Sequence, residues 1–132
     1  MKIQDVMVPC PYHVDAAMTL DEALHVMSLR GVRHLPVVTN EGDLLGVVTE
    51  RALRLTQLVV AESGVIPLVE SVCDVSPYTV TVDTLVSEVA LDMAERRLDY
   101  VLIVDSEGNL SGIFTAGDAC RLVYMLLEEM GS

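Results

Sequence analysis

A threonine and an aspartate three residues apart, Thr115 and Asp118, carry the clearest chemistry in the sequence. An apolar run ends at Thr115 and a helical pattern follows it, and the free N–H groups at the start of a helix favour a phosphate. The Asp118 carboxylate can accept two hydrogen bonds from a diol such as that of a ribose. The same spacing is also typical of a helix capping box, in which the two residues only satisfy each other's backbone. The spacing alone leaves both interpretations open.

Other reactive side chains do not form a recognisable catalytic or metal-binding set. Cys10 and His13 have the spacing of two zinc ligands, but no second pair with matching spacing completes a site. Nucleophile elbows, phosphate-binding Gly-Lys-Ser/Thr loops and dinucleotide-binding glycine patterns do not occur. We therefore expect no metal site and no enzymatic activity. The three scattered cysteines, Cys10, Cys73 and Cys120, are typical of reduced thiols in a cytoplasmic protein.

The composition excludes two classes of partner. The 132 residues carry a formal net charge of −12, from 20 acidic and 8 basic side chains. Duplex nucleic acid and anionic membrane surfaces both require clustered cations, so we expect the protein to bind neither. Hydrophobic residues make up 52% of the chain, yet their unbroken runs are too short to span a bilayer. We expect a cytoplasmic protein with an aliphatic core.

The chain is an internal duplication with an offset of 66 residues. Without any gap, Tyr12 matches Tyr78, Met27 matches Met93, and further matches include Val14 with Val80, Glu22 with Glu88, Gly46 with Gly112, and Thr49 with Thr115. A match that keeps its register through glycines, turns and apolar pairs is not a chance event. We therefore divide the chain into repeat 1, residues 1–66, and repeat 2, residues 67–132, which together form one globular module.

Each repeat predicts the same order of elements. In repeat 1, Thr19 and Glu22 form a capping box ahead of an amphipathic helix that Gly31 ends, and strands at 34–38 and 44–48 and a helix at 50–62 follow. Repeat 2 predicts a helical stripe at 86–93, strands at 100–104 and 110–114, and a last helix reaching Met130. We expect an α/β (α+β) fold of two β-α-β-β-α repeats, packed through their sheets with pseudo-two-fold symmetry.

Four segments together resemble the cystathionine-β-synthase (CBS) domain family. The segment 5–9 resembles its lead-in, 31–38 its hydrophobic-Pro-Val-Val strand, and 46–49 and 112–118 its Gly-x-x-Thr-x-x-Asp signature. The resemblance extends from about Gln4 to Met130 and identifies a tandem pair, or Bateman module. It implies a regulatory module, not an enzyme, that binds adenine nucleotides or adenosyl compounds in clefts between the repeats and dimerises through helices.

The resemblance also assigns roles to individual residues. It places Asp118 at the ribose and Thr115 at the ribose or phosphate, and it completes this first cleft with Met7, Cys10, Tyr12, Val32, Arg33, His34 and Ile113. Tyr12 is either a ring that stacks on a purine or a packing element. The second, weaker cleft takes Val47, Thr49, Ser76, Tyr78, Leu98 and Asp99. There Ala52 replaces the signature aspartate, and Asp99 adds negative charge, so we expect one good site.

Charge orders the expected ligands as AMP, then ADP or S-adenosylmethionine, then ATP, because a −12 protein repels a triphosphate most. None of these is required as a cofactor. The alternative function is a ligand-free dimerisation or protein-interaction module. Apolar stripes on the linking helix at 50–62 and on the last helix predict a homodimer under both hypotheses.

Overall fold

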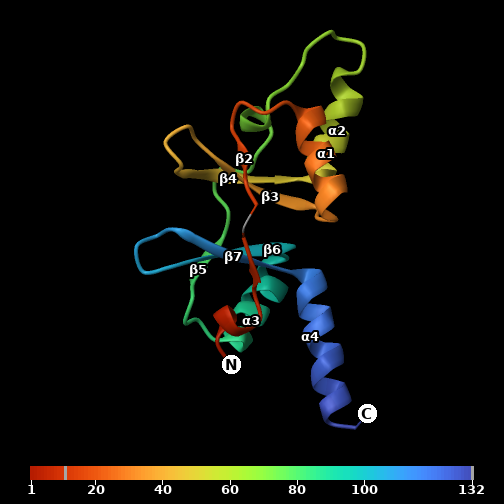
Figure 1. Ribbon diagram of the computed structural model, residues 1–132. Helices are drawn as coiled ribbons and strands as arrows, with labels where there is room; N and C mark the ends of the chain where they lie inside the picture. Colours follow the sequence, from red (N-terminus) through yellow and green to blue (C-terminus); the bar gives the residue numbers. More distant parts are fainter. Residues whose placement is uncertain (11, 132) are drawn as a thin grey trace. The chain divides into compact units, whose positions relative to one another are not determined.

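The computed structural model describes residues 1–10 and 12–131 (Figure 1). Its elements follow the order η1 (Ile3–Asp5), β1 (Val8–Pro9), β2 (Val14–Asp15), α1 (Leu20–Arg30), β3 (His34–Val38), β4 (Leu44–Thr49), α2 (Glu50–Val60), η2 (Val69–Ser71), β5 (Thr79–Thr81), α3 (Val86–Arg96), β6 (Tyr100–Val104), β7 (Leu110–Thr115) and α4 (Ala116–Glu129), where η marks a 3-10 helix. This arrangement confirms the expected mixed α/β fold.

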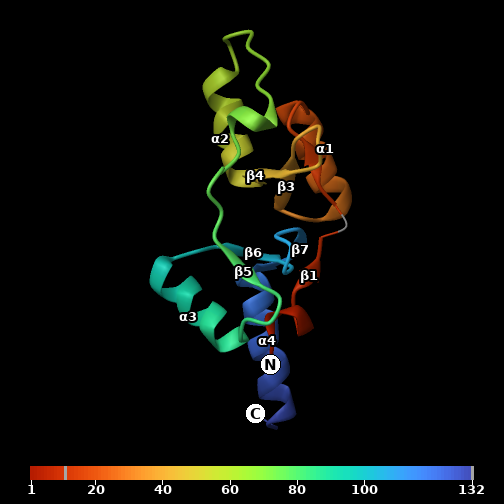
Figure 2. The same ribbon diagram turned by 90° about the vertical axis from the view of Figure 1, so that its left-hand side faces the viewer.

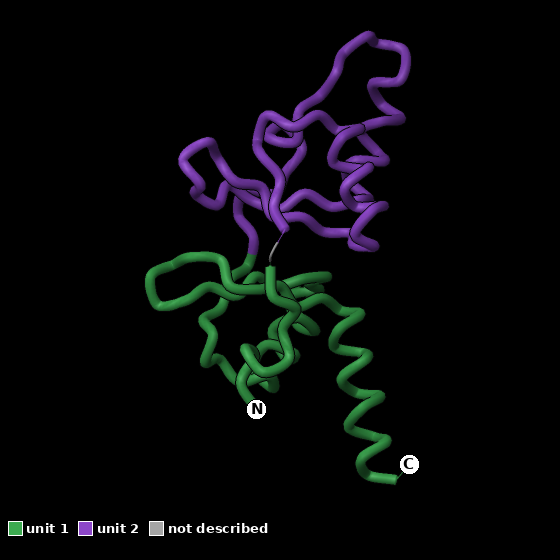
Figure 3. Tube along the Cα trace, viewed as in Figure 1, with its two compact units in different colours: residues 1–10, 78–132 green, residues 11–77 purple. Residues whose placement is uncertain are grey.

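The chain forms two compact units that differ from the two sequence repeats (Figure 3). Unit 1 combines residues 1–10 with 78–132, and unit 2 contains residues 11–77. The lead-in of each repeat, which precedes its first helix, therefore packs with the other repeat. The division at residue 66 separates two similar sequences, whereas the compact units exchange their lead-ins.

Unit 2 is a three-stranded sheet in the order β2-β3-β4 with α1 and α2 packed against it. The predicted capping box is present, because the Thr19 side chain accepts from the Glu22 N–H and the Glu22 carboxylate accepts from the Thr19 N–H. Gly31 ends α1 at a φ of 66°, a conformation that favours glycine. The α2 helix ends at Val60, two residues before the predicted end.

Unit 1 is a four-stranded sheet in the order β1-β7-β6-β5, with α3 and α4. Its buried cluster brings Ile3 from the start of the chain together with α3, β6 and β7, whose members are Val89, Met93, Val101, Ile103 and Phe114. The α4 helix continues directly from β7 and projects beyond the rest of this unit (Figures 1 and 2). None of the described α4 residues is buried.

The exchange of lead-ins occurs in both units at matching positions of the repeat. In unit 1, Val8 pairs with Ile113 of β7, and in unit 2, Asp74 pairs with Val47 of β4. These pairs are related by the same 66-residue offset as the repeats. Gly46 and Gly112 lie under the crossing segments, where an added Cβ would stand 2.1 Å from the Asp74 carbonyl oxygen and 2.5 Å from the Met7 sulfur, respectively. The two matched glycines therefore make room for the lead-ins.

Across the described residues, no helix is both long and apolar enough to cross a membrane.

Candidate functional site

The junction of β7 and α4 in unit 1 contains the predicted capping box. The Asp118 N–H donates to Thr115 Oγ1 at 3.2 Å, and the Thr115 N–H donates to Asp118 Oδ2 at 2.9 Å. Both contacts arise because β7 ends at Thr115 in extended conformation and the helix starts at the next residue. The capping interpretation of this pair is confirmed.

The second carboxylate oxygen of Asp118 has a different environment. Arg121, one turn further along α4, donates from Nη1 to Asp118 Oδ1 at 3.2 Å. The Arg121 side chain is 70% exposed and that of Asp118 is 15% exposed. An exposed ion pair of this kind contributes little stability, so a ligand can replace the guanidinium at low cost. Capping through Oδ2 is therefore compatible with hydrogen bonding of a ligand through Oδ1.

The N-terminal lead-in brings two further predicted residues, Met7 and Cys10, next to β7. Because β1 runs antiparallel to β7, Val8 pairs with Ile113, and the Cys10 N–H donates to the Ser111 carbonyl at 3.3 Å. Unit 1 contains five of the residues predicted for the first cleft, and all five are half-buried: Met7, Cys10, Ile113, Thr115 and Asp118. Half-burial leaves part of each side chain accessible to a ligand.

Cys10 is a poor nucleophile in this position. Burial raises the pKa of its thiol to about 11, because the thiolate would lose the solvation it has in water. At neutral pH the sulfur is therefore a protonated, weakly polar surface. It is suited to contact with an apolar or aromatic group.

The other predicted residues of the first cleft lie in unit 2. Val32 and Arg33 precede β3, His34 begins it opposite Thr49, and the Arg33 carbonyl accepts from the Glu50 N–H at 2.9 Å. That these residues and those of unit 1 line one cleft stays a prediction.

Tyr12 pairs with a cation of its own repeat. The Arg30 guanidinium lies 4.1 Å from the centre of the Tyr12 ring, and Arg96 lies 4.7 Å from that of Tyr78. The arrangement is the same in both repeats, which favours a packing role for one ring face. The Tyr12 side chain remains 40% exposed.

The members of the second predicted cleft also divide between the units, with Val47, Thr49 and Ser76 in unit 2 and Tyr78, Leu98 and Asp99 in unit 1. Thr49 caps α2 by accepting from the Ala52 N–H at 3.1 Å, but alanine offers no carboxylate. The Tyr78 hydroxyl donates to Asp92, and this hydrogen bond raises the pKa of the phenol. Position 52 thus lacks the acceptor present at 118.

Arg121 and Asp92 have no role predicted from the sequence, yet they contact the predicted site residues Asp118 and Tyr78, respectively. The Asp118–Arg121 spacing of three residues on a helix is a signal for an ion pair. Comparison of the repeats shows that this pair is specific to repeat 2, because Ala52 and Leu55 stand at the matching positions of repeat 1. Within the described ranges, no group of three or more His, Cys, Asp or Glu side chains is placed to hold a metal ion.

Comparison with known proteins gives a consistent result. The CBS domain model matches residues 3–58 and 69–124. A CBS domain-containing protein of Dictyostelium discoideum is 27% identical over 97% of this chain and 94% of its own length. The chain spans only 15% to 31% of several longer curated relatives, among them an A-adding tRNA nucleotidyltransferase of Aquifex aeolicus.

Solved structures share the fold. A Vibrio cholerae protein assigned to acetoin utilization superposes with a TM-score of 0.88, is 26% identical, and covers 100% of this chain and 98% of its own. The structure of CBSX2 in complex with AMP gives a TM-score of 0.77 at 26% identity, covering 95% of this chain and 97% of that one. The expected resemblance is confirmed. The chain belongs to the CBS domain family and contains two CBS domains in tandem.

Proposed function

We propose that this protein is a regulatory module that binds an adenosyl compound at the β7–α4 junction of unit 1. The observation that carries the proposal is the divided role of the Asp118 carboxylate, which accepts from the backbone through Oδ2 and, among residues 1–10 and 12–131, meets only the exposed Arg121 at Oδ1. A ribose diol can replace that arginine and donate to Oδ1. The N–H groups at the start of α4 lie beside it and suit a phosphate.

AMP is the first choice of ligand. The relative CBSX2 has been crystallised with AMP. The net charge of −12 disfavours ATP most, and S-adenosylmethionine and ADP lie between the two. The role is regulatory and not catalytic, in agreement with the match of two CBS domains to most of the chain.

The test compares two capping boxes of the same design. Asp118→Ala and Glu22→Ala each remove the carboxylate of a box at the start of a helix, so both are expected to lose about 0.3–1 kcal/mol of stability. Only Asp118→Ala is expected to weaken AMP binding, by at least tenfold in isothermal titration. Adenosine, ADP, ATP and S-adenosylmethionine are titrated in parallel to rank the ligands.

Two results would contradict the proposal. The first is wild-type protein that binds none of the five compounds at millimolar concentration. The second is AMP binding that Asp118→Ala and Glu22→Ala weaken equally, because the carboxylate would then act only through stability.

A second candidate function, a dimerisation and protein-interaction module, is favoured by two exposed apolar helix faces. On α2, Leu55, Leu58 and Val59 are 55%, 76% and 83% exposed. On α4 the exposed group comprises Val123, Tyr124, Met125, Leu126 and Leu127, and the exposed Met130 follows directly after the helix. Exposed apolar side chains that gather on two helices of a small domain favour association with a second copy.

The homodimer has a direct test in light scattering. Wild-type protein at micromolar concentration is expected to show about twice the chain mass of 14.4 kDa. Leu58→Glu combined with Met125→Glu places charges on both faces and is expected to give the single-chain mass. Leu91→Glu on α3, where the side chain is also 57% exposed, is the matched control and is expected to leave the dimer intact. A wild-type mass near 14.4 kDa would contradict the dimer.

A further inference from the structure

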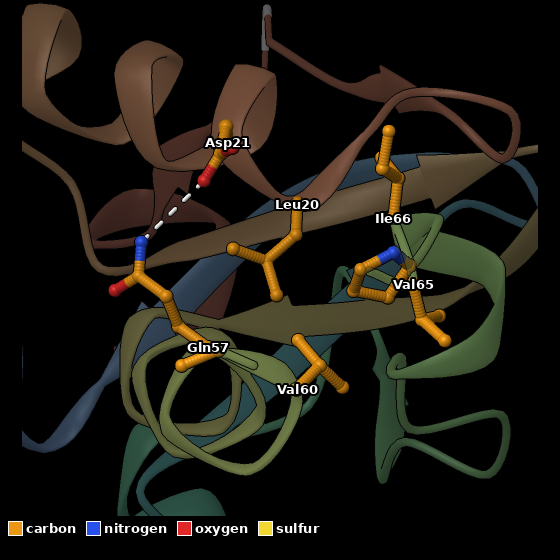
Figure 4. Close-up of a pocket in the computed structure, with 8 residues that line it drawn as sticks. Leu20, Asp21, Gln57, Val60, Val65 and Ile66 are labelled. Carbon is orange, nitrogen blue, oxygen red and sulfur yellow. Dashed lines mark hydrogen bonds between the residues drawn. The ribbon is translucent and has the colours of Figure 1, made fainter. Parts of the chain in front are cut away.

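Unit 2 contains a pocket that belongs to neither predicted cleft (Figure 4). It has a volume of about 270 Å³ and lies where the start of α1, the end of α2 and the following loop meet. Its lining is mostly aliphatic and consists of Leu20, Asp21, Gln57, Val60, Ala61, Val65, Ile66 and Pro67. The volume is slightly below the ~300–1,000 Å³ of sites for drug-sized ligands, which favours an occupant smaller than a nucleotide.

The polar groups of the pocket stand on one side of it. Figure 4 shows the Asp21 carboxylate facing the Gln57 amide, while Leu20, Val60 and Ile66 surround the remaining space. Gln57 Nε2 donates to Asp21 Oδ1 at 3.4 Å, a long contact that restrains the carboxylate only weakly. The pocket thus combines one negative charge with an apolar interior.

The basic side chains of α1 and α2 lie away from the pocket, which leaves the charge of Asp21 uncompensated there. The contact of Asp21 with Gln57 places the start of α1 against the later part of α2, so Arg30 and Arg51 lie at the opposite ends of the two helices. Arg54 lies in the middle of α2, one turn before Gln57, and does not line the pocket. Arg30 lies about 13 Å along α1 from Asp21. The described lining includes no lysine or arginine. An anion is therefore disfavoured in the pocket and a cation is favoured.

We propose that this pocket binds a small aliphatic amine. The ammonium group pairs with Asp21 and displaces Gln57 from the carboxylate, and a branched hydrocarbon of four to six carbons, roughly the size of a leucine side chain, lies against Leu20, Val60 and Ile66. Ile66 and Val65 are 73% and 59% exposed, so a ligand that covers them also buries apolar surface of the loop. This site is independent of the adenosyl site proposed above.

The experiment is a titration of the full chain, labelled with ¹⁵N, with 3-methylbutylammonium chloride followed by NMR. Saturable shifts are expected at the amides of Leu20, Asp21, Val60 and Val65. The uncharged analogue 3-methylbutanol is expected to bind about three- to fivefold more weakly, because it lacks the charge that the exposed Asp21 carboxylate recognises. Equal affinities for the two compounds, or shifts that spread over the surface without saturation, would overturn the proposal.

Variants locate the charge that is recognised. Asp21→Asn is expected to weaken binding of the ammonium probe about three- to fivefold, whereas Glu41→Gln, which neutralises an exposed acid in the turn after β3, is expected to change it less than twofold. Gln57→Glu adds a second carboxylate and is expected to tighten binding at least threefold. This gain keeps the proposal testable if Asp21→Asn impairs folding. No loss with Asp21→Asn in folded protein, or no gain with Gln57→Glu, would count against the site.

Discussion

Gly46→Ala is expected to lower the free energy of unfolding by about 3–5 kcal/mol. The added Cβ would stand 2.1 Å from the Asp74 carbonyl oxygen and 2.8 Å from its carbon, and neither backbone atom can rotate away. The lead-in must therefore move, which breaks both backbone hydrogen bonds between Asp74 and Val47, at 2.8 and 3.0 Å. Thermal unfolding is expected to shift downward on the order of 10 °C.

The other glycines provide a graded control. Gly112→Ala places its Cβ against the flexible Met7 side chain at 2.5 Å and the Val8 carbonyl oxygen at 2.9 Å, so a smaller loss of about 1–3 kcal/mol is expected. Gly117→Ala lies in the first turn of α4 with its nearest contact at 3.7 Å, and is expected to stabilise the protein by about 0.5–1 kcal/mol. A Gly46→Ala variant no more destabilised than Gly112→Ala would contradict the close approach of the Asp74 backbone to Gly46 of β4.

Ile3→Ala is expected to destabilise unit 1 by about 3 kcal/mol, although Ile3 lies at the far end of the sequence from most of that unit. The Ile3 side chain is 0% exposed and belongs to the cluster of Val89, Ile103 and Phe114. Truncation leaves a cavity that the surrounding β6, β7 and α3 cannot fill. The measurement is native-state hydrogen exchange, in which amides of β6 are expected to lose more protection than those of β3.

The matching residue of repeat 2 provides the reciprocal control. Val69 lies 66 residues after Ile3, is also 0% exposed, and belongs to the core of unit 2. Val69→Ala is expected to cost about 2 kcal/mol and to reduce protection of β3 more than that of β6. If both variants affected the same strands, the reciprocal exchange of lead-ins would be contradicted.

Local patterns predicted the regular elements well. The Thr19–Glu22 box, Gly31 at the end of α1 and the strands His34–Val38 and Tyr100–Val104 agree with the structure because each depends on neighbours a few residues away. The helix expected at 50–62 ends at Val60, because the following turn takes over its hydrogen bonds: the Ser63 N–H and hydroxyl both donate to the Val60 carbonyl, at 3.0 and 2.8 Å.

Long-range features were harder to predict from the residues alone. The burial of Ile3 and Val69 depends on strands far along the chain, and an isolated apolar residue in a short 3-10 helix shows no periodic stripe. The aliphatic pocket beside Asp21 is formed by segments that no motif connects. The spacing of Thr115 and Asp118 predicted the candidate site, but it could not predict that the two carboxylate oxygens of Asp118 have separate partners.

The exchange of lead-ins also sets an order of assembly during synthesis. Unit 2 is one continuous segment, so all of its contacts exist as soon as residue 77 has left the ribosome. Unit 1 must keep Val8 unpaired until Ile113 has been made, an interval of roughly 100 residues or about 5–20 s at ordinary translation rates. Of the four strands of its sheet, β1 is translated first and is among the last to be paired.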